Sequence, residues 1–349
     1  MRPILFSVRV GGTVVPFPSY GALVALGFVL GIGLFVRSGR RQGFDPGRLQ
    51  DLAFSSVVLG LVGARIAFVL LNVRAFLDAC WPGAARAVGA GAGDRWVQGG
   101  CFGPLRFWDG GLVFYGGAVA VGGVVWLTCR REGWAFLRLG DLAAPSVALG
   151  HAVGRIGCLM AGCCYGKPCA APWAVRFGPG SVAFDEGLSP GRFPPTSASA
   201  WTAPLHPTQL YEAIGELAIF VSLVLIERRR AGADGRAADR PGGPASARPT
   251  TADPSSPGPA ASAPGSLLGG YVLAYAALRF GVEIFRGDVG RGYLFRCPTP
   301  RLAAALGLGL AEPLFLSTSQ AVSLLLGAAV ALGFWRSRLR RRASHKIRR

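Results

Sequence analysis

Residues 150–166 read GHAVGRIGCLMAGCCYG, and this stretch decides the fold of the chain. It closes a long apolar segment that begins near Leu142, yet it carries His151 and Arg155 one helical turn apart, on one helix face. Burying an arginine in hydrocarbon costs at least roughly 2.5–3.5 kcal/mol, so such residues usually face a polar cavity and mark function. The glycines of the stretch allow another helix or a ligand head group to approach closely. We expect an anionic group beside Arg155.

The composition indicates a membrane protein. The chain has 349 residues, of which 51% are hydrophobic and 52 are glycine, and its mean hydropathy is +0.41. Apolar stretches of about 18–20 residues recur along it, which is the length that crosses a bilayer. The net charge of +19 comes from arginines clustered beside these stretches, a pattern typical of topology and of anionic lipid head groups. Nucleic acid is therefore not an expected partner.

The hydropathy pattern predicts an all-α polytopic membrane protein with about seven transmembrane helices. The expected spans are residues 20–36, 52–71, 112–129, 142–160, 206–226, 267–285 and 321–334. Arginine clusters follow the odd-numbered spans, and positively charged ends face the cytoplasm. The N-terminus is therefore expected outside and the C-terminus in the cytoplasm.

A segment of different composition divides the chain into three parts. Residues 231–265 hold almost no large apolar side chain, so they cannot offset their ordering entropy and are predicted to be a disordered cytoplasmic linker. Residues 1–230 before it contain spans one to five and a head-group site, and residues 266–349 contain the last two spans and a basic tail. Three further segments are expected outside the membrane: an extended segment at 1–19 and loops at 73–108 and 163–205.

A charged set stands out in the sixth span. Arg279, Glu283 and Arg286 have i, i+4, i+7 spacing and share one helix face. The planar guanidinium fork matches two phosphate oxygens, so Arg155 and Arg279 could hold one phosphodiester from two helices and stabilise a leaving phosphate. In the alternative reading, Arg279 and Glu283 only pair with each other, and Arg286 extends to the membrane surface.

The histidines and cysteines allow several interpretations. His151 is either a general base or a residue that only donates one hydrogen bond, and His206 could be an interfacial cap. Four cysteines lie within or just after the central stretch, at positions 158, 163, 164 and 169, and could provide zinc ligands or disulfides. We predict no metal, and a disulfide that joins Cys163 or Cys164 to Cys169 on the outer side is one plausible pairing.

The central stretch resembles the signature G-R-x-G-N-F-x-N-x-E-x-x-G of the prolipoprotein diacylglyceryl transferase family. The matching residues are Gly154, Arg155, Gly157 and Gly166. Cys158 and Ala161 stand where the family has its two asparagines, and Cys163 stands where it has glutamate. These three polar contacts of the family are therefore altered here.

Three other segments strengthen the resemblance. Residues 206–212, HPTQLYE, are similar to the family's H-P-[ST]-Q-L-Y-E, and residues 279–286 fit its R-x-x-x-E-x-x-R pattern. Residues 108–111, WDGG, and the later pair Gly116–Gly117 resemble its W-D-G-G…H-G-G stretch, with Tyr115 where many members have histidine. Together these motifs cover the seven-span skeleton except the linker.

The resemblance implies an enzyme of the bacterial inner (cytoplasmic) membrane. Its reaction would transfer the diacylglyceryl group of phosphatidylglycerol to the lipobox cysteine thiol of a prolipoprotein and release glycerol-1-phosphate, without any cofactor. The implied catalytic residues are Arg155, Arg279, Glu283 and Tyr115; the implied substrate-binding residues are Tyr20, Gly154, Gly157, Gly166, His206, Gln209 and Arg286. The base would be Tyr115, His151 or none. A family-like transferase with another acceptor and a lipid-binding or transport protein are the alternatives.

Overall fold

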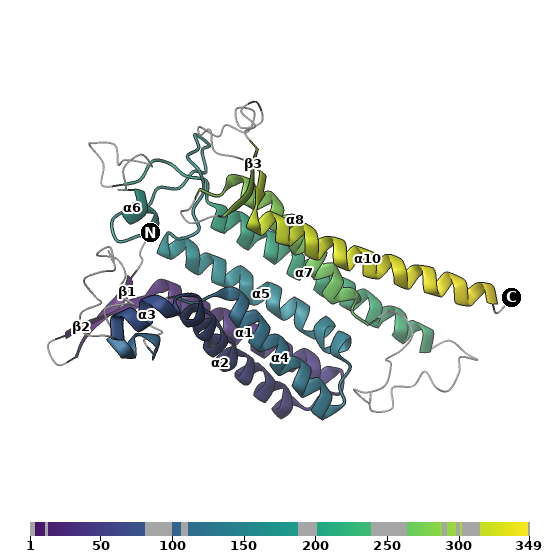
Figure 1. Cartoon of the computed structure of the whole chain (residues 1–349). Helices are drawn as coiled ribbons and strands as arrows, with labels where there is room; N and C mark the ends of the chain where they lie inside the picture. The colour runs from purple at the N-terminus through teal and green to yellow at the C-terminus, as the bar shows by residue number, and fades with distance from the viewer. Residues whose placement is uncertain are drawn as a thin grey trace. The chain divides into compact units, whose positions relative to one another are not determined.

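The computed structural model describes residues 4–10, 13–80, 100–105, 111–187, 201–238, 264–287, 292–297, 301 and 315–347. Its strands are β1 (Ile4–Val10), β2 (Thr13–Pro18), β3 (Tyr293–Cys297) and β4 (Phe315–Ser317). Its helices are α1 (Ser19–Arg41), α2 (Pro46–Leu71), α3 (Val73–Cys80), η2 (Gly100–Leu105), α4 (Phe114–Glu132), α5 (Phe136–Ala161), α6 (Val182–Gly187), α7 (Thr208–Ala238), α8 (Ser266–Phe285) and α10 (Thr318–Ile347). Figure 1 shows that long helices dominate the chain.

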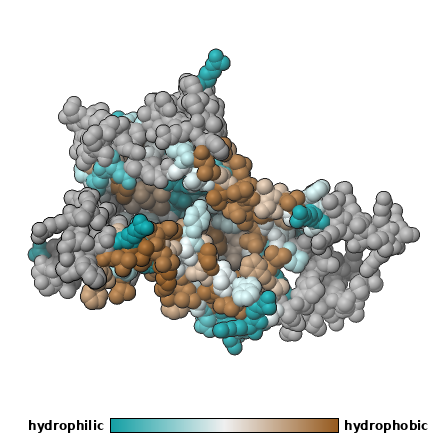
Figure 2. All heavy atoms as spheres, viewed as in Figure 1, coloured by the Kyte–Doolittle hydropathy of each residue, from teal (hydrophilic) through white to brown (hydrophobic). Residues whose placement is uncertain are grey.

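Each of the seven predicted spans coincides with a helix, although the spans at 112–129 and 206–226 begin two residues before α4 and α7. In the described part of the chain, six helices are long and apolar enough to cross a membrane, namely α1, α2, α5, α7, α8 and α10. α4, the predicted third span, is shorter, rich in glycine, and ends in Arg130 and Arg131. Large apolar side chains such as Phe54 and Val119 are exposed on the helices, and Figure 2 shows brown apolar areas across the visible face. A lipid phase would cover them, so the all-α polytopic membrane class is confirmed; the number of spans and the orientation of the termini stay predictions.

Two helices continue past the predicted ends of their spans. α7 runs to Ala238, so residues 231–238 of the predicted linker are helical, and residues 239–263 lie outside the described part. α10 runs to Ile347 and includes most of the basic tail. Alanine and arginine are strong helix formers, so a charged cluster ends an apolar span without ending the helix.

The segments expected outside the membrane contain some regular structure. The N-terminal segment is extended as predicted and forms an antiparallel hairpin of β1 and β2, in which Phe6 stacks on Phe17 at 4.7 Å. β3 and β4 form a second antiparallel pair. Loop 163–205 includes the short helix α6. In the same loop, Tyr165, Phe177 and Leu205 form a small buried core.

The chain divides into two compact units, the first made of residues 1–35, 140–249 and 259–349. In this unit α7, α8 and α10 run side by side (Figure 1). Ala144 of α5, Leu223 of α7 and Leu267 of α8 form a buried core. On the other side of α5, a Cβ at Gly27 of α1 would lie 2.8 Å from the carbonyl oxygen of Gly150. The predicted close approach of a helix at this glycine is therefore confirmed.

The start of α8 is capped from another helix. Its N-cap residue is Gly265, which has no side chain to bond the first backbone N–H groups. Asp141 of α5 supplies the acceptors instead, because its carboxylate accepts hydrogen bonds from the N–H groups of Gly265 at 2.7 Å and Leu268 at 2.8 Å. One negative side chain thus ties two membrane helices together at a helix N-terminus.

We expect Asp141→Ala to lower the thermal unfolding temperature of the purified chain in detergent. The two N–H groups lose their acceptors, which corresponds to a loss of about 1–2 kcal/mol. Asp51→Ala is the matched control, because Asp51 is exposed on α2. Equal unfolding temperatures for the two variants would show that the cap does not stabilise the fold.

In the second unit, residues 36–139, α4 packs against α2 through glycines. A Cβ at Gly117 would lie 3.0 Å from the carbonyl oxygen of Gly60, and one at Gly116 would collide with Ala67. The pair Gly116–Gly117 that follows Tyr115 therefore brings two helix backbones together. The preceding motif residues 108–110 lie outside the described residues.

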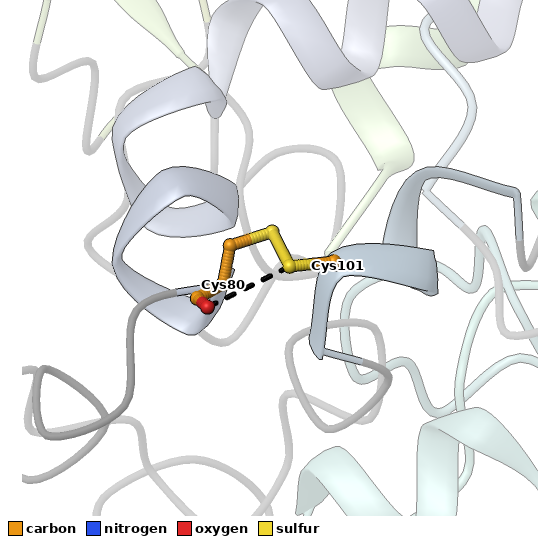
Figure 3. Close-up of a disulfide and its surroundings, with 2 residues drawn as sticks. All are labelled: Cys80 and Cys101. Carbon is orange, nitrogen blue, oxygen red and sulfur yellow. Dashed lines mark hydrogen bonds between the residues drawn. A yellow bond between two sulfur atoms is a disulfide. The ribbon is translucent and has the colours of Figure 1, made fainter.

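A disulfide joins α3 and η2 in this unit, between Cys80 and Cys101 (Figure 3). The predicted disulfide of Cys163 or Cys164 with Cys169 is wrong, because all three thiols are free. The turn after α5 directs the first two toward Cys158 instead, so their sulfur atoms gather there.

The loop beside this disulfide is fixed by Arg65, a buried residue of α2. Its guanidinium donates hydrogen bonds to the carbonyl oxygens of Gly103 at 2.7 Å, Pro104 at 2.9 Å and Gly111 at 3.0 Å. This arginine within an apolar span therefore binds backbone of its own chain. Its charge-assisted bonds connect α2 to η2 and to Gly111.

Candidate functional site

Three helices of the first unit each supply two polar residues four positions apart, and the six side chains meet. The pairs are His151 and Arg155 from α5, Glu212 and Glu216 from α7, and Arg279 and Glu283 from α8. Residues four apart on a helix share one face, so each apolar helix presents a single polar spot. The three spots together form a charged cluster inside the helix packing.

Glu212 lies at the centre of this cluster. Its Oε1 is 2.8 Å from Nη2 of Arg155, and its Oε2 is 3.2 Å from Nη1 of Arg279. Tyr275 donates a further hydrogen bond to Oε1 at 3.4 Å. The Glu212 side chain is 2% exposed, and both arginines are 14% exposed. One buried carboxylate therefore fixes both predicted phosphate-binding groups relative to each other.

His151 is held between an arginine and a second glutamate. Its Nε2 accepts a hydrogen bond from Nε of Arg155 at 3.1 Å, and its Nδ1 lies 2.6 Å from Oε1 of Glu216. Arginine only donates hydrogen bonds, so Nε2 must carry a lone pair and the ring proton sits on Nδ1, facing Glu216. This arrangement orients the Arg155 guanidinium and occupies the nitrogen that a general base would use.

The residues of the sixth-span motif occupy different places. Arg279 pairs with Glu283 at 3.1 Å, as the alternative reading expected, and also donates to Ser319 of α10 at 3.4 Å. Its simultaneous contact with Glu212 shows that it does more than pair locally. Arg286 is buried, which contradicts the part of the alternative reading that extended it to the membrane surface.

The charges in the cluster are distributed unevenly. Two guanidinium groups face the three carboxylates of Glu212, Glu216 and Glu283, all at most 3% exposed. The arginines and His151 are the more accessible members, the histidine being 27% exposed. The accessible side of the cluster is therefore cationic, and the buried carboxylates lie behind it. The two guanidinium groups are the charged members of the cluster that an anion could reach, although the three buried carboxylates outnumber them.

Arg286 is placed by a backbone ladder behind the cluster. It forms a bridge with Gly166, whose N–H donates to the carbonyl of His206 at 3.0 Å. A Cβ at Gly166 would collide with His206 and with the carbonyl oxygen of Phe285. Gly166 is thus required for close approach of three backbone segments, and its buried position does not face an open site.

The other two predicted glycines, Gly154 and Gly157, have different surroundings. Gly157 is buried, and a Cβ there would lie 3.3 Å from the Tyr20 carbonyl oxygen and the Leu23 Cβ of α1. No atom among the described residues lies within 4 Å of a Cβ at Gly154. Tyr20 itself is 44% exposed. Gly154 and Tyr20 are therefore accessible positions, on α5 and α1. Gly157 lies where α5 packs against α1.

His206 and Gln209 have separate surroundings. His206 lines a cavity of 440 Å³ together with Trp173, Tyr211 and Phe285, and its Nδ1 lies 3.1 Å from the Tyr211 hydroxyl. Gln209 is buried and donates to the carbonyl oxygen of Cys163 at 2.7 Å. It holds the turn after α5.

Tyr115 lies in the second unit, at the start of α4. Its side chain is 60% exposed and its ring contacts Phe114 at 5.8 Å. The other predicted catalytic residues lie in the first unit, so the catalytic role of Tyr115 stays a prediction.

Sequence reasoning missed Glu212 and Glu216. Glu212 belongs to the quoted HPTQLYE motif but was not assigned to the site, and Glu216 follows it by four residues in an apolar span. The i, i+4 spacing was the available signal, because the same spacing selected His151 with Arg155 and Arg279 with Glu283. Ionisable residues within a span mark functional sites by default.

One group of residues has the composition of a metal site. The sulfur atoms of Cys158, Cys163 and Cys164 all lie within 4.8 Å of one another, and the three residues are partly buried. Thiolates are ligands for zinc and other soft ions. These three cysteines are among the four that the sequence offered as possible zinc ligands, although the prediction made there was no metal.

The fold and the site together define a class: a multi-pass membrane protein with a buried ion-pair cluster whose accessible side is cationic. Comparison identifies the family. The model of the family described as prolipoprotein diacylglyceryl transferase matches residues 3–238. That range exceeds half of the chain, and the chain belongs to this family.

Three relatives named as phosphatidylglycerol–prolipoprotein diacylglyceryl transferases illustrate the similarity. The protein from Clostridium tetani is 27% identical over 232 residues, which cover 66% of this chain and 75% of the relative. The one from Frankia alni is 32% identical over 216 residues, with 62% and 48% covered. The one from Mycobacteroides abscessus is 28% identical over 223 residues, with 62% and 57% covered. The chain thus spans three quarters of the first relative and about half of the other two.

Proposed function

We propose that this chain transfers the diacylglyceryl group of phosphatidylglycerol to the cysteine thiol of a prolipoprotein lipobox. The relatives are named for phosphatidylglycerol and prolipoprotein as substrates. The observation that carries the proposal is the convergence of Arg155 and Arg279 on Glu212 within apolar helices. Two cationic forks from two helices suit the phosphodiester of an anionic lipid.

The transfer reaction requires stabilisation of the negative charge on the leaving phosphate. The thiolate sulfur attacks the glycerol carbon that carries the phosphate ester; the C–S bond forms as the C–O bond breaks. The electron pair of that bond leaves on glycerol-1-phosphate, and the thiol proton is lost before attack. Arg155 and Arg279 stabilise the leaving phosphate, in a site where few water molecules screen the interaction. Glu212, Glu283 and His151 position the two guanidinium groups.

The proposed location is the bacterial cytoplasmic membrane, with the N-terminus and loop 73–108 outside. Arginines end α1 and α4, at Arg40–Arg41 and Arg130–Arg131, and positive ends face the cytoplasm. The disulfide of Cys80 with Cys101 supports an outer position for its loop, because disulfides persist in oxidising compartments.

The test is diacylglyceryl transfer by the purified chain in phosphatidylglycerol nanodiscs to a synthetic lipobox peptide. We expect a peptide product heavier by one diacylglyceryl group and an equal amount of glycerol-1-phosphate. A peptide with serine in place of the lipobox cysteine is the control and should gain nothing. Lipid binding or lipid transport without glycerol-1-phosphate release would contradict the proposal. Release with no thioether product would indicate another acceptor.

A further inference from the structure

Three thiols meet at the end of α5, next to the arginine cluster. Cys158 lies in the last turn of this helix, and Cys163 and Cys164 follow its end at Ala161. All three are free and partly buried, with sulfur atoms within 4.8 Å of one another. Cys158 is three positions after Arg155, so both side chains lie on the same helix face.

The backbone is shaped to bring these thiols together. Cys164 has φ 56° and Gly162 has φ 72°, and the left-handed region is uncommon for a residue other than glycine. Such a conformation costs free energy and persists where the surroundings impose it. Here Thr208 donates to the carbonyl of Cys164 at 2.6 Å, and Gln209 donates to that of Cys163 at 2.7 Å. The first turn of α7 therefore fixes the two thiols over the end of α5.

The spacing of the three sulfur atoms suits a tetrahedral metal ion. Zn–S bonds of about 2.3 Å in tetrahedral geometry put the sulfur atoms about 3.8 Å apart, a small contraction from the observed grouping. Three protein ligands with one open position are the pattern of catalytic rather than structural zinc sites. Arg155 lies three positions before Cys158 on α5, and its positive charge opposes the negative charge that three thiolates leave on a zinc complex.

We propose that Cys158, Cys163 and Cys164 bind one Zn²⁺ ion, whose fourth position receives the acceptor thiol as a thiolate. The identity of the acceptor rests on the proposed function. A metal-bound thiol is deprotonated outright, which supplies the nucleophile without a general base. The acceptor S–H loses its proton to water when the Zn–S bond forms. The sulfur then attacks the lipid carbon, the carbon–oxygen bond to phosphate breaks, and the thioether product leaves the ion.

This site also accounts for the position of His151. Its Nε2 accepts the Nε–H of Arg155 and its Nδ1 faces Glu216, so its ring is engaged in positioning the arginine. Activation of the thiol and stabilisation of the leaving phosphate would then occur on neighbouring turns of one helix face, at Cys158 and Arg155. The two reacting groups of a displacement must be held close together for the step to be fast.

The first test measures metal binding to the full-length chain, purified with a reductant in detergent. After removal of metal by a chelator, Co²⁺ should bind at one equivalent and give the visible absorption bands of a tetrahedral thiolate complex, which Zn²⁺ then bleaches. Each of Cys158→Ser, Cys163→Ser and Cys164→Ser should weaken Co²⁺ binding by more than about 100-fold, since even an outer partner of a ligand is worth 10–100-fold. Cys129→Ser, in α4, is the matched control and should bind normally.

The wild-type titration needs no variant, so a serine variant that misfolds does not affect the test. Failure of the wild-type chain to bind Co²⁺ or Zn²⁺ would overturn the proposal. So would binding that survives all three serine substitutions, or a disulfide among the three thiols in the reduced preparation.

The second test uses the Co²⁺-loaded protein and a lipobox peptide in the absence of phosphatidylglycerol. The cysteine peptide should change the visible bands as its sulfur enters the fourth position, and the serine peptide should not. An unchanged spectrum would refute acceptor coordination. This result rests on the lipobox peptide as the acceptor of the proposed function, whereas the metal titration of the chain alone does not. Full transfer activity in metal-free protein would overturn the role of zinc in thiol activation and leave the proposed function intact. A metal site that responds to the peptide thiol, in a protein that carries out no transfer, would overturn the proposed function and leave the zinc site intact.

Discussion

Diacylglyceryl transfer is expected to slow by about 100-fold when either Arg155 or Arg279 is replaced by lysine. Lysine keeps the charge but loses the planar fork that binds two oxygen atoms at once. In this protein each guanidinium group also binds the Glu212 carboxylate through one of its nitrogen atoms. An ammonium group cannot hold that carboxylate and bind a phosphate in fixed directions. Alanine should be worse still, since the leaving phosphate then lacks a charged donor in a poorly solvated site.

The measurement is the initial rate of transfer to a lipobox peptide, normalised to folded protein. Arg48→Lys is the matched control, because Arg48 pairs with Glu132 at 2.8 Å on the surface of the second unit and its side chain is 61% exposed. A surface pair of this kind contributes little, so the control should keep its rate. Normal rates for both lysine variants would remove the two-fork clamp from the mechanism, and normal rates for both alanine variants would remove the arginines.

The sequence was sufficient to place the helices and one half of the charged cluster. Each apolar span became a helix because hydropathy over about twenty residues leaves little choice of structure in a membrane. Arg155 and Arg279 could be predicted to meet for a related reason. A cation in an apolar helix must find a partner, and the nearest polar surface is that of another such helix.

The partners themselves could not be predicted in this way. The contact of Arg155 with Glu212 depends on how α5 and α7 pack and rotate, which no local pattern encodes. The disulfide shows the same limit, because several cysteines allow many connectivities that spacing cannot distinguish. Cys80 and Cys101 are 21 residues apart and are brought together by α3 and η2.

The contacts of α8 link a segment outside the family match to the matched part of the chain. The family model matches residues 3–238, so the segment that holds Arg279, Glu283 and Arg286 lies beyond the matched range. Yet Arg279 reaches Glu212, which lies within that range, at 3.2 Å. Asp141 of α5 also caps the start of α8. These contacts tie α8 to the matched part of the chain, and they carry the inclusion of its arginine in the site.

Glu212→Gln is expected to lower the transfer rate by about 100-fold while tightening the binding of glycerol phosphate about tenfold. The carboxylate gives one oxygen to each of two guanidinium groups, and the neutral amide has a single acceptor and turns an NH₂ donor toward one arginine. The forks then lose their fixed directions, which slows the displacement. The same change frees their donors from an internal anion, so an external phosphate meets less competition.

A slower transfer reaction together with tighter glycerol phosphate binding would show that Glu212 positions the arginines. A variant that had lost its fold would show a lower transfer rate and weaker binding. Glycerol phosphate binding is measured by calorimetry on detergent-solubilised protein, and transfer by the peptide assay. Glu283→Gln is the matched control: Glu283 is equally buried and pairs with Arg279, whereas Glu212 joins the two arginines, so Glu283→Gln should change the rate and the affinity less. An unchanged rate in Glu212→Gln would show that the central carboxylate has no part in the reaction. Weaker glycerol phosphate binding would show that the phosphate and the carboxylate do not compete for the same donors.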